Sequence, residues 1–206
     1  MQKTIKKNVI IVGTGIHLGR PARLTIKPAP TNHGIVFKRL DVDHNNTLIK
    51  ANFKNILSGE LCTTLVNEEG ISVKTVEHLL AAFSGLGISN ALIEIDNEEI
   101  PILDGSSLKF AQALIDAGIC EQDESLNFCS VKKSIKVVNK NSWVKFEPAD
   151  NLILTVCIDY PNTCIGKQSL SLLISKDTFQ KELCDNRTFC LKNDIKDMRS
   201  RGFALG

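Results

Sequence analysis

The 206-residue sequence has no excess of either charge, no long hydrophobic run and no closely spaced pair of cysteines. Lys and Arg total 25 and Asp and Glu total 23, and a formal net charge of +2 excludes a protein dedicated to binding nucleic acid. A mean hydropathy of −0.01 excludes a disordered or membrane-spanning chain. The apolar run at residues 9–12 is too short for a secretory signal, so we expect neither export nor a transmembrane segment. The composition predicts a soluble globular protein with one large domain or two small ones.

The seven cysteines are odd in number and scattered, without a Cys-x-x-Cys pair. A disulfide scaffold needs dense cysteines in a short secreted chain, and a zinc ribbon needs close pairs, so both classes are excluded. Reduced thiols in the cytoplasm fit this pattern best.

Two regions of similar plan follow one another along the chain. In the first, alternating apolar residues indicate strands at residues 6–12, 22–28, 34–40 and 90–96. Helical spacing indicates a helix at residues 75–83. Thr75 is its expected N-cap, which puts His78 in the first turn.

A second helix is expected to begin at Ser106 or Ser107 and to end at Gly118. Its predicted buried stripe is formed by Leu108, Ala111, Leu114 and Ile115.

An acidic, polar stretch near residues 121–127 is the expected linker, and a second series of strands and helices follows it. The strands are predicted at residues 131–139, 143–148, 152–160 and 169–174, and the helices at 177–184 and 194–199. The prediction is therefore an α+β protein with a first domain at residues 1–122 and a second at 128–206. The second domain lacks a closing strand and helix, and the glycine-ended residues 201–206 lead us to expect a truncated chain or a smaller domain.

The glycines at residues 13–19 follow a strand, as they do in dinucleotide-binding loops. Such a loop needs a helix directly after it, to present backbone amides to pyrophosphate. Here an alternating strand follows instead, so a glycine hairpin between two strands is favoured over a nucleotide loop.

Glu77 and His78 form the most informative pair in the sequence. A carboxylate beside an imidazole at a helix start can supply a general base next to a metal ligand, as zinc hydrolases require. The pair alone is a weak signal, and on its own it favours a surface helix terminus whose acidic residue suits the dipole. His33 and His44 lie in polar segments and are expected to be solvated.

Five separated motifs together resemble one known family. They are Gly13-x-Gly15-x-His17, Leu61-Cys62-Thr63, the segment at residues 75–87, the segment at residues 99–106, and Arg187-Thr188-Phe189. Their order and spacing resemble the UDP-3-O-acyl-N-acetylglucosamine deacetylases of lipid A biosynthesis, from about Thr4 to Gly206.

The resemblance implies a zinc-dependent amide hydrolase. In it His78 is one of three zinc ligands, Glu77 is the general base, and Thr188 donates a hydrogen bond to the oxyanion. Phe189 would pack on the sugar, and the acyl chain would pass near Leu61 and Ile195. The implied fold has two α+β domains, each a sheet with helices on one face, packed helix to helix around the active site. The resemblance implies UDP-3-O-acyl-N-acetylglucosamine as the partner. Together with the cysteines and the charge, we expect a cytoplasmic monomer that binds no nucleic acid.

The sequence also departs from the family pattern. The other two zinc ligands lie in a His-Lys-x-x-Asp segment that this chain does not contain, together with a further His that serves as general acid. A lysine that contacts the nucleotide phosphates corresponds to Ser142, and Cys190 replaces a glycine after Phe189.

Three hypotheses therefore stay open. The chain is the N-terminal two-thirds of a zinc deacetylase, or it is a non-catalytic remnant that binds without hydrolysis. A third possibility is a zinc site assembled from His17, Cys62 and His78. With one identifiable ligand, we expect residues 1–206 alone to bind zinc poorly and to lack deacetylase activity.

Overall fold

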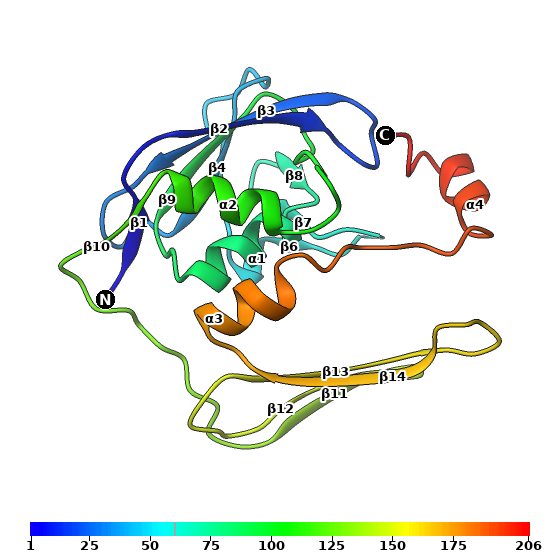
Figure 1. The fold of residues 1–206 in the computed structure, drawn as a ribbon. Coiled ribbons are helices and arrows are strands. Elements are labelled where there is room, and N and C mark those ends of the chain that lie inside the picture. Colours follow the sequence, from blue (N-terminus) through cyan, green and yellow to red (C-terminus); the bar gives the residue numbers. More distant parts are fainter. Residues whose placement is uncertain (60) are drawn as a thin grey trace.

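The computed structural model describes residues 1–59 and 61–206, and its architecture is α+β, as predicted. Its centre is a five-stranded sheet in the order β2-β3-β9-β4-β5 (Figure 1). The strands are β2 (Val9–Thr14), β3 (Pro21–Pro28), β9 (Ala91–Ile95), β4 (Ile35–Arg39) and β5 (Leu48–Lys50). All neighbours pair antiparallel except β4 and β9, which are parallel.

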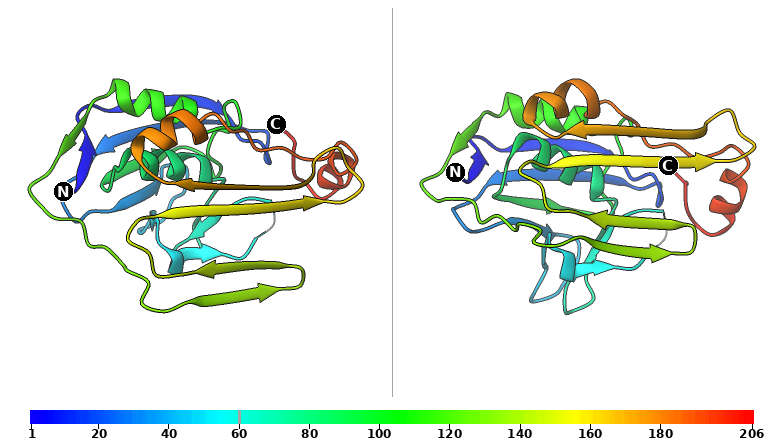
Figure 2. Two further views of the ribbon diagram at one scale, coloured as in Figure 1. Left: turned by 60° about the horizontal axis from the view of Figure 1, so that its bottom comes forward. Right: turned by 90° about the horizontal axis from the view of Figure 1, so that it is seen from below.

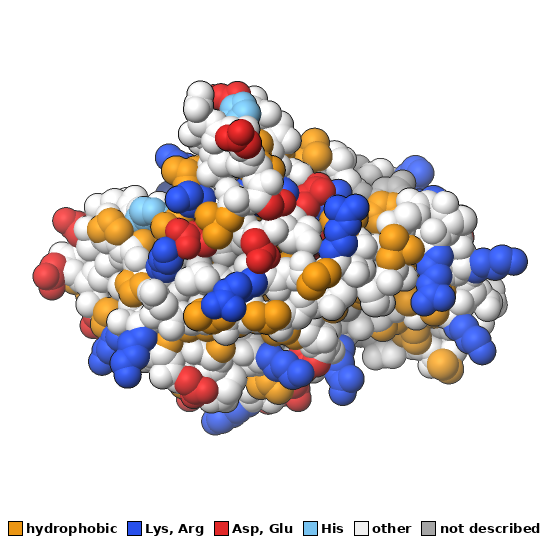
Figure 3. Space-filling view, turned by 90° about the horizontal axis from the view of Figure 1, so that it is seen from above, with side chains coloured by type: hydrophobic (Ala, Val, Ile, Leu, Met, Phe, Trp, Pro, Cys, Tyr) orange, Lys and Arg blue, Asp and Glu red, His pale blue; other side chains and the backbone are white. Residues whose placement is uncertain are grey.

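In β3 and β9, buried side chains alternate with less buried ones, because successive side chains of a strand point to opposite faces. In β3, Leu24 and Ile26 are fully buried, and in β9 Ala91, Ile93 and Ile95 are fully buried. The opposite face carries charged pairs such as Lys27 and Glu94, whose Nζ and Oε2 lie 2.7 Å apart. Seen from outside, apolar side chains on this side of the molecule are interspersed with Lys, Arg, Asp and Glu (Figure 3).

Two helices cover the inner face of the sheet and complete the core (Figure 1). They are α1 (Glu77–Leu86) and α2 (Leu108–Asp116). The buried residues of α1 are Leu79, Ala82, Phe83 and Leu86, and those of α2 are Phe110, Ala111 and Leu114. The predicted stripe of α2 was wrong at Leu108, which is 40% exposed, because the helix turns Phe110 inward in its place.

Short elements close the edges of this first region. They are β1 (Lys3–Ile5) with β10 (Ile119–Glu121), a 3₁₀ turn η1 (Phe53–Asn55), and the three-stranded sheet β6 (Ile56–Leu57), β7 (Thr64–Val66) and β8 (Ser72–Lys74).

The predicted cap of α1 is wrong, whereas the predicted cap of α2, Ser106 or Ser107, is confirmed. Helix α1 begins at Glu77 with Val76 at the N-cap position, and Thr75 does not cap it, because its hydroxyl donates to the buried Glu99 carboxylate. Ser107 occupies the N-cap position of α2, but its hydroxyl donates to the Cys184 carbonyl at 3.1 Å. Ser106 supplies the capping oxygen instead, since it accepts from the Leu108 N–H at 3.1 Å.

The second region consists of two hairpins and three short helical segments. The hairpins are β11 (Ile135–Asn139) with β12 (Ser142–Phe146), and β13 (Ile153–Tyr160) with β14 (Gly166–Leu173). They lie side by side but are not joined into one sheet (Figure 2). The helical segments are α3 (Lys176–Thr178), the π-helical turn η2 (Phe179–Leu183) and α4 (Ile195–Ser200).

A helix-to-helix contact connects the two regions, between α1 and the segment α3–η2 (Figure 1). The ring of Phe179 is 5% exposed and lies against Gly85 of α1, where a Cβ atom would overlap the ring. The predicted packing of helices between two strand layers is thus present, and the predicted boundaries of 1–122 and 128–206 stay a prediction. Over the described part of the chain, no helix combines the length and apolar character that a membrane crossing needs.

Candidate active site

Glu77 and His78 open helix α1, so both lie in its first turn as predicted. The N-terminus of a helix carries a partial positive charge, which suits an acidic residue in the first turn such as Glu77. The Thr63 N–H donates to Glu77 Oε2 at 3.0 Å, so the carboxylate is held from the segment before β7. Both side chains are half-buried and therefore reachable by a ligand.

A cavity of about 480 Å³ brings this pair together with residues of the second region. Glu77, His78 and His17 line it from one side, and Thr188, Phe189 and Tyr160 line it from the other. Leu61 and Ile102 add apolar wall. Its volume is within the range of small-molecule sites.

Backbone and side-chain contacts fix the segment that carries Thr188. The Thr188 N–H donates to the Gly105 carbonyl at 2.8 Å, in the turn before α2. The rings of Phe189 and Tyr160 lie 5.5 Å apart in a tilted arrangement. The motif at residues 99–106 therefore holds the Arg187-Thr188-Phe189 motif at the cavity, although about 80 residues separate them in sequence.

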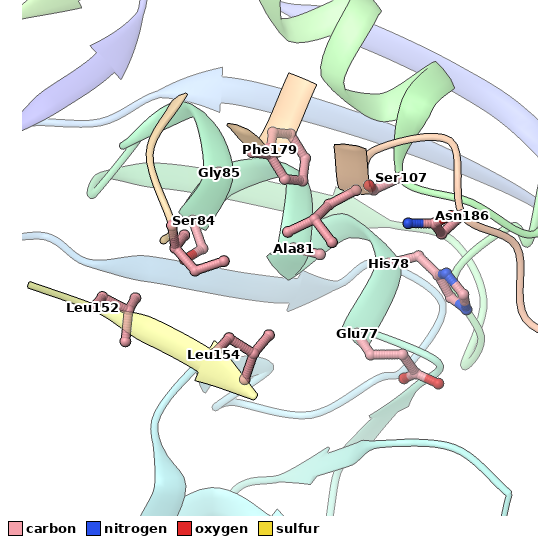
Figure 4. Close-up of a pocket in the computed structure, with 12 residues that line it drawn as sticks. Glu77, His78, Ala81, Ser84, Gly85, Ser107, Leu152, Leu154, Phe179 and Asn186 are labelled. Atoms are coloured by element: carbon pink, nitrogen blue, oxygen red, sulfur yellow. The ribbon is translucent and has the colours of Figure 1, made fainter. Parts of the chain in front are cut away.

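A second cavity, of about 440 Å³, adjoins the same two residues (Figure 4). It lies between α1 and the second region, and Leu152, Leu154 and Phe179 give it an apolar lining. Glu77 and His78 lie at one end of it, and the Phe179 ring lies at the other (Figure 4). Glu77 and His78 therefore line both cavities.

His17, which lines the first cavity, and Cys62 affect each other's pKa values. A hydrogen bond with the Cys62 thiol raises the pKa of His17 above its ordinary value, against the opposing effect of burial. Burial opposes ionisation of Cys62, but hydrogen bonds from His17 and Thr64 hold the pKa of this thiol below its ordinary value. His17 is 5% exposed, its Nδ1 has no hydrogen-bond partner among the described residues, and its ring meets Phe203 edge-on at 5.3 Å.

The glycines at residues 13–19 form the connection between β2 and β3, as the hairpin interpretation predicted. No helix follows them, so the nucleotide-loop alternative was wrong. His17 lies on this hairpin and lines the cavity.

Comparison with known proteins decides the family. The family model described as "LpxC: UDP-3-O-acyl N-acetylglycosamine deacetylase" matches residues 2–206. The chain belongs to this family.

Curated proteins agree with the family match. Proteins named UDP-3-O-acyl-N-acetylglucosamine deacetylase from Histophilus somni and Pasteurella multocida are 40% and 39% identical to this chain over 207 residues. A protein of the same name from Idiomarina loihiensis is 40% identical. Each alignment covers 100% of this chain and 67–68% of the relative.

The next question is whether the described residues could hold the zinc ion that the family resemblance implies. In residues 1–59 and 61–206, no group of three or more His, Cys, Asp or Glu side chains is arranged to hold a metal ion. The three side chains of the alternative zinc site, His17, Cys62 and His78, do not form such a group, so this alternative is wrong as a three-ligand set. Zinc sites need at least three protein ligands, and the described residues do not fit that requirement.

Of the six site residues predicted from sequence, five line the first cavity: Leu61, Glu77, His78, Thr188 and Phe189. Ile195 does not, although its neighbours Asp194 and Asp197 do, so its place beside an acyl chain stays a prediction. Sequence reasoning missed Tyr160 and the buried Glu99. The available signal for Glu99 was an acidic residue followed directly by the apolar residues Ile100-Pro101-Ile102.

Proposed function

We propose that this protein hydrolyses the N-acetyl group of UDP-3-O-acyl-N-acetylglucosamine, a step of lipid A biosynthesis. Family membership and the names of the relatives support this activity. The main observation in support of the proposal is that Glu77 and His78 from α1 line the same cavity as Thr188 and Phe189 from the second region. These are the residue types that amide hydrolysis needs in one place.

Glu77 is the proposed general base. Its carboxylate takes a proton from the water whose oxygen attacks the acetamide carbonyl carbon, and general-base catalysis of this kind contributes roughly 10²–10⁴ in rate. The carbon–nitrogen bond then breaks, the proton that Glu77 removed from the water passes to the sugar nitrogen, and acetate and the amine are released. The Thr63 N–H keeps the Glu77 carboxylate oriented while this happens.

Thr188 is the proposed donor to the oxyanion that forms at the carbonyl oxygen. A neutral hydroxyl suits this role because it stabilises developing charge without an ionised partner. Phe189, which is 55% exposed, offers an aromatic face to the sugar ring, and Leu61, which is 48% exposed, offers an apolar contact to the acyl chain.

Zinc is the proposed cofactor, with His78 as one of its ligands. The described residues alone do not complete a zinc site, so the further ligands must come from elsewhere. We therefore also propose that residues 1–206 alone exchange zinc freely and turn over little substrate. The odd number of scattered cysteines supports a reducing, cytoplasmic location, and we expect a monomer.

The test uses a chimaera in which the segment of a curated relative that carries His-Lys-x-x-Asp is joined after Gly206. Glu77→Gln keeps the size of the side chain and removes the base. It should lower kcat by roughly 10²–10⁴ while zinc, measured in the same preparation, stays bound.

Glu68→Gln, in the turn between β7 and β8, is the matched control and should keep the parental rate. Parental turnover by Glu77→Gln would refute the role of Glu77. A chimaera that binds zinc and substrate but hydrolyses nothing would favour the binding remnant instead.

A further inference from the structure

Glu99 is a buried carboxylate that joins two segments of the candidate active site. It is 1% exposed and lies in the connection between β9 and α2. Its Oε1 accepts from the His17 N–H at 2.8 Å and from the Thr75 hydroxyl at 3.0 Å. Its Oε2 accepts from the Leu18 N–H at 2.7 Å. Two backbone amides and one hydroxyl therefore converge on one side chain.

The first segment is the hairpin that carries His17. At Gly15 a Cβ atom would overlap the Glu99 carboxylate, so only glycine lets this hairpin approach the carboxylate so closely. The second glycine of the Gly13-x-Gly15 motif is thus explained by Glu99. The hairpin with this motif therefore binds a carboxylate of the protein itself, through the N–H groups of His17 and Leu18.

The second segment is the turn that leads into α1. Thr75 has φ of +59°, a left-handed conformation that is unusual for a β-branched residue. Such strained conformations persist where surrounding contacts determine them, and they cluster at functional sites. The Thr75 hydroxyl bond to Glu99 is such a contact, two residues ahead of Glu77.

Backbone hydrogen bonds between Lys74 and the residues on either side of Glu99 fix its position. The Lys74 N–H donates to the Glu98 carbonyl at 2.8 Å, and the Ile100 N–H donates to the Lys74 carbonyl at 3.1 Å. The carboxylate therefore has a rigid base from which to hold Thr75 and the His17 hairpin.

We propose that Glu99 is the positioning residue of this site, which holds the His17 hairpin and the Thr75 turn in one frame and so directs Glu77 and His78 toward the cavity. As a contribution to catalysis this rests on the proposed function, because the site that Glu99 positions is the proposed deacetylase site. The positioning itself is a property of residues 1–206 and can be measured without turnover.

The first experiment is hydrogen–deuterium exchange of the 206-residue protein, read by mass spectrometry. Glu99→Gln keeps the shape but leaves one acceptor oxygen and places an NH₂ group against a backbone N–H. Exchange should rise roughly tenfold or more in residues 15–18 and 75–80, the factor expected when a hydrogen bond to a charged acceptor is lost. Exchange in β9 and α2 should stay within about twofold of the parent.

Glu98→Gln is the matched control. The Glu98 carboxylate pairs with Lys74 at 2.9 Å near the surface and does not line the cavity, so its loss should change exchange in neither segment. Thr75→Val removes the hydroxyl and should loosen residues 75–80 only, whereas Thr75→Ser keeps the hydroxyl and should behave as the parent. Unchanged exchange in Glu99→Gln, or a uniform rise over the whole chain, would overturn the proposal.

The second experiment measures kcat and KM of the active chimaera. Misplacement of the base and of His78 should lower kcat in Glu99→Gln by roughly tenfold or more, with KM within about twofold. A rise in KM alone would contradict positioning of the catalytic pair. If Glu77→Gln keeps the parental rate while exchange still loosens in Glu99→Gln, the proposed function fails and the positioning role stands.

Discussion

The first region of the molecule has a closed core, whereas the hairpins of the second region leave many apolar side chains in solvent. Ile93, Phe83 and Leu114 of the first region are between 0% and 1% exposed. On the two hairpins, Val137, Trp143 and Leu170 are between 54% and 65% exposed. Strands with apolar side chains occur in both regions, so whether these side chains are buried depends on the elements that pack over the strands. Helices α1 and α2 cover the five-stranded sheet, but the short segments α3, η2 and α4 cover little of the hairpins.

This difference also separates the two halves of the candidate active site. Glu77 and His78 stand on a helix that is packed into the core, while Thr188 and Phe189 stand on an exposed segment. The second group is held mainly by the Thr188 bond to Gly105 and by the ring contact between Phe189 and Tyr160. We infer that the placement of Thr188 depends on the docking of the second region against the first.

The sharpest test of this contrast is the same substitution in each region. Ile93→Ala removes a fully buried side chain from β9, and it should lower the free energy of unfolding by about 2–5 kcal/mol. Ile135→Ala removes a 49% exposed side chain from β11, and it should change that free energy by about 0.5 kcal/mol or less. Urea titration followed by circular dichroism measures both.

Trp143, the single tryptophan, lies on β12 and reports on the second region separately. A transition in its fluorescence at a lower urea concentration than the circular dichroism transition would sharpen the comparison. If Ile93→Ala and Ile135→Ala lowered the free energy of unfolding equally, the contrast between the two regions would be wrong, because the hairpin would then be buried as well.

A smaller effect is expected at the contact between the two regions. Gly85→Ala places a methyl group where the Phe179 ring lies, so the ring or the helix must shift. Overpacking of this kind should lower the free energy of unfolding by about 1–3 kcal/mol. Ser84→Ala, the neighbouring exposed position on α1, is the control and should cost about 0.5 kcal/mol or less. A neutral Gly85→Ala would mean that the regions do not pack here.

Alternation and helical spacing predicted the parts of the fold that are long and have one buried face. Strands β2, β3, β4 and β9 and helix α1 were predicted within a few residues of their observed bounds. The short strands β1, β5, β6, β7, β8 and β10 were missed because two or three residues give no period. The hairpins were predicted as strands, but their separation into two sheets depends on tertiary packing that no local pattern encodes.

The site was predicted through motifs, and the errors arose where a side chain has a distant partner. Thr75 resembles an N-cap in sequence, but its hydroxyl donates to Glu99, 24 residues later. Glu99 itself was missed as a site residue because its three donors come from two separate segments. His17 was considered as a metal ligand, and the effect of Cys62 on its pKa appears only when the chain is folded.

The most direct test of a site built from both regions is the rate of Thr188→Val in the active chimaera. This substitution keeps the shape of the side chain and removes the proposed oxyanion donor, while Thr155→Val makes the same change on exposed strand β13. We predict that Thr188→Val lowers kcat by about 10²–10³ with little change in KM, and that Thr155→Val keeps the parental values. A parental kcat in Thr188→Val, with or without a raised KM, would contradict the account.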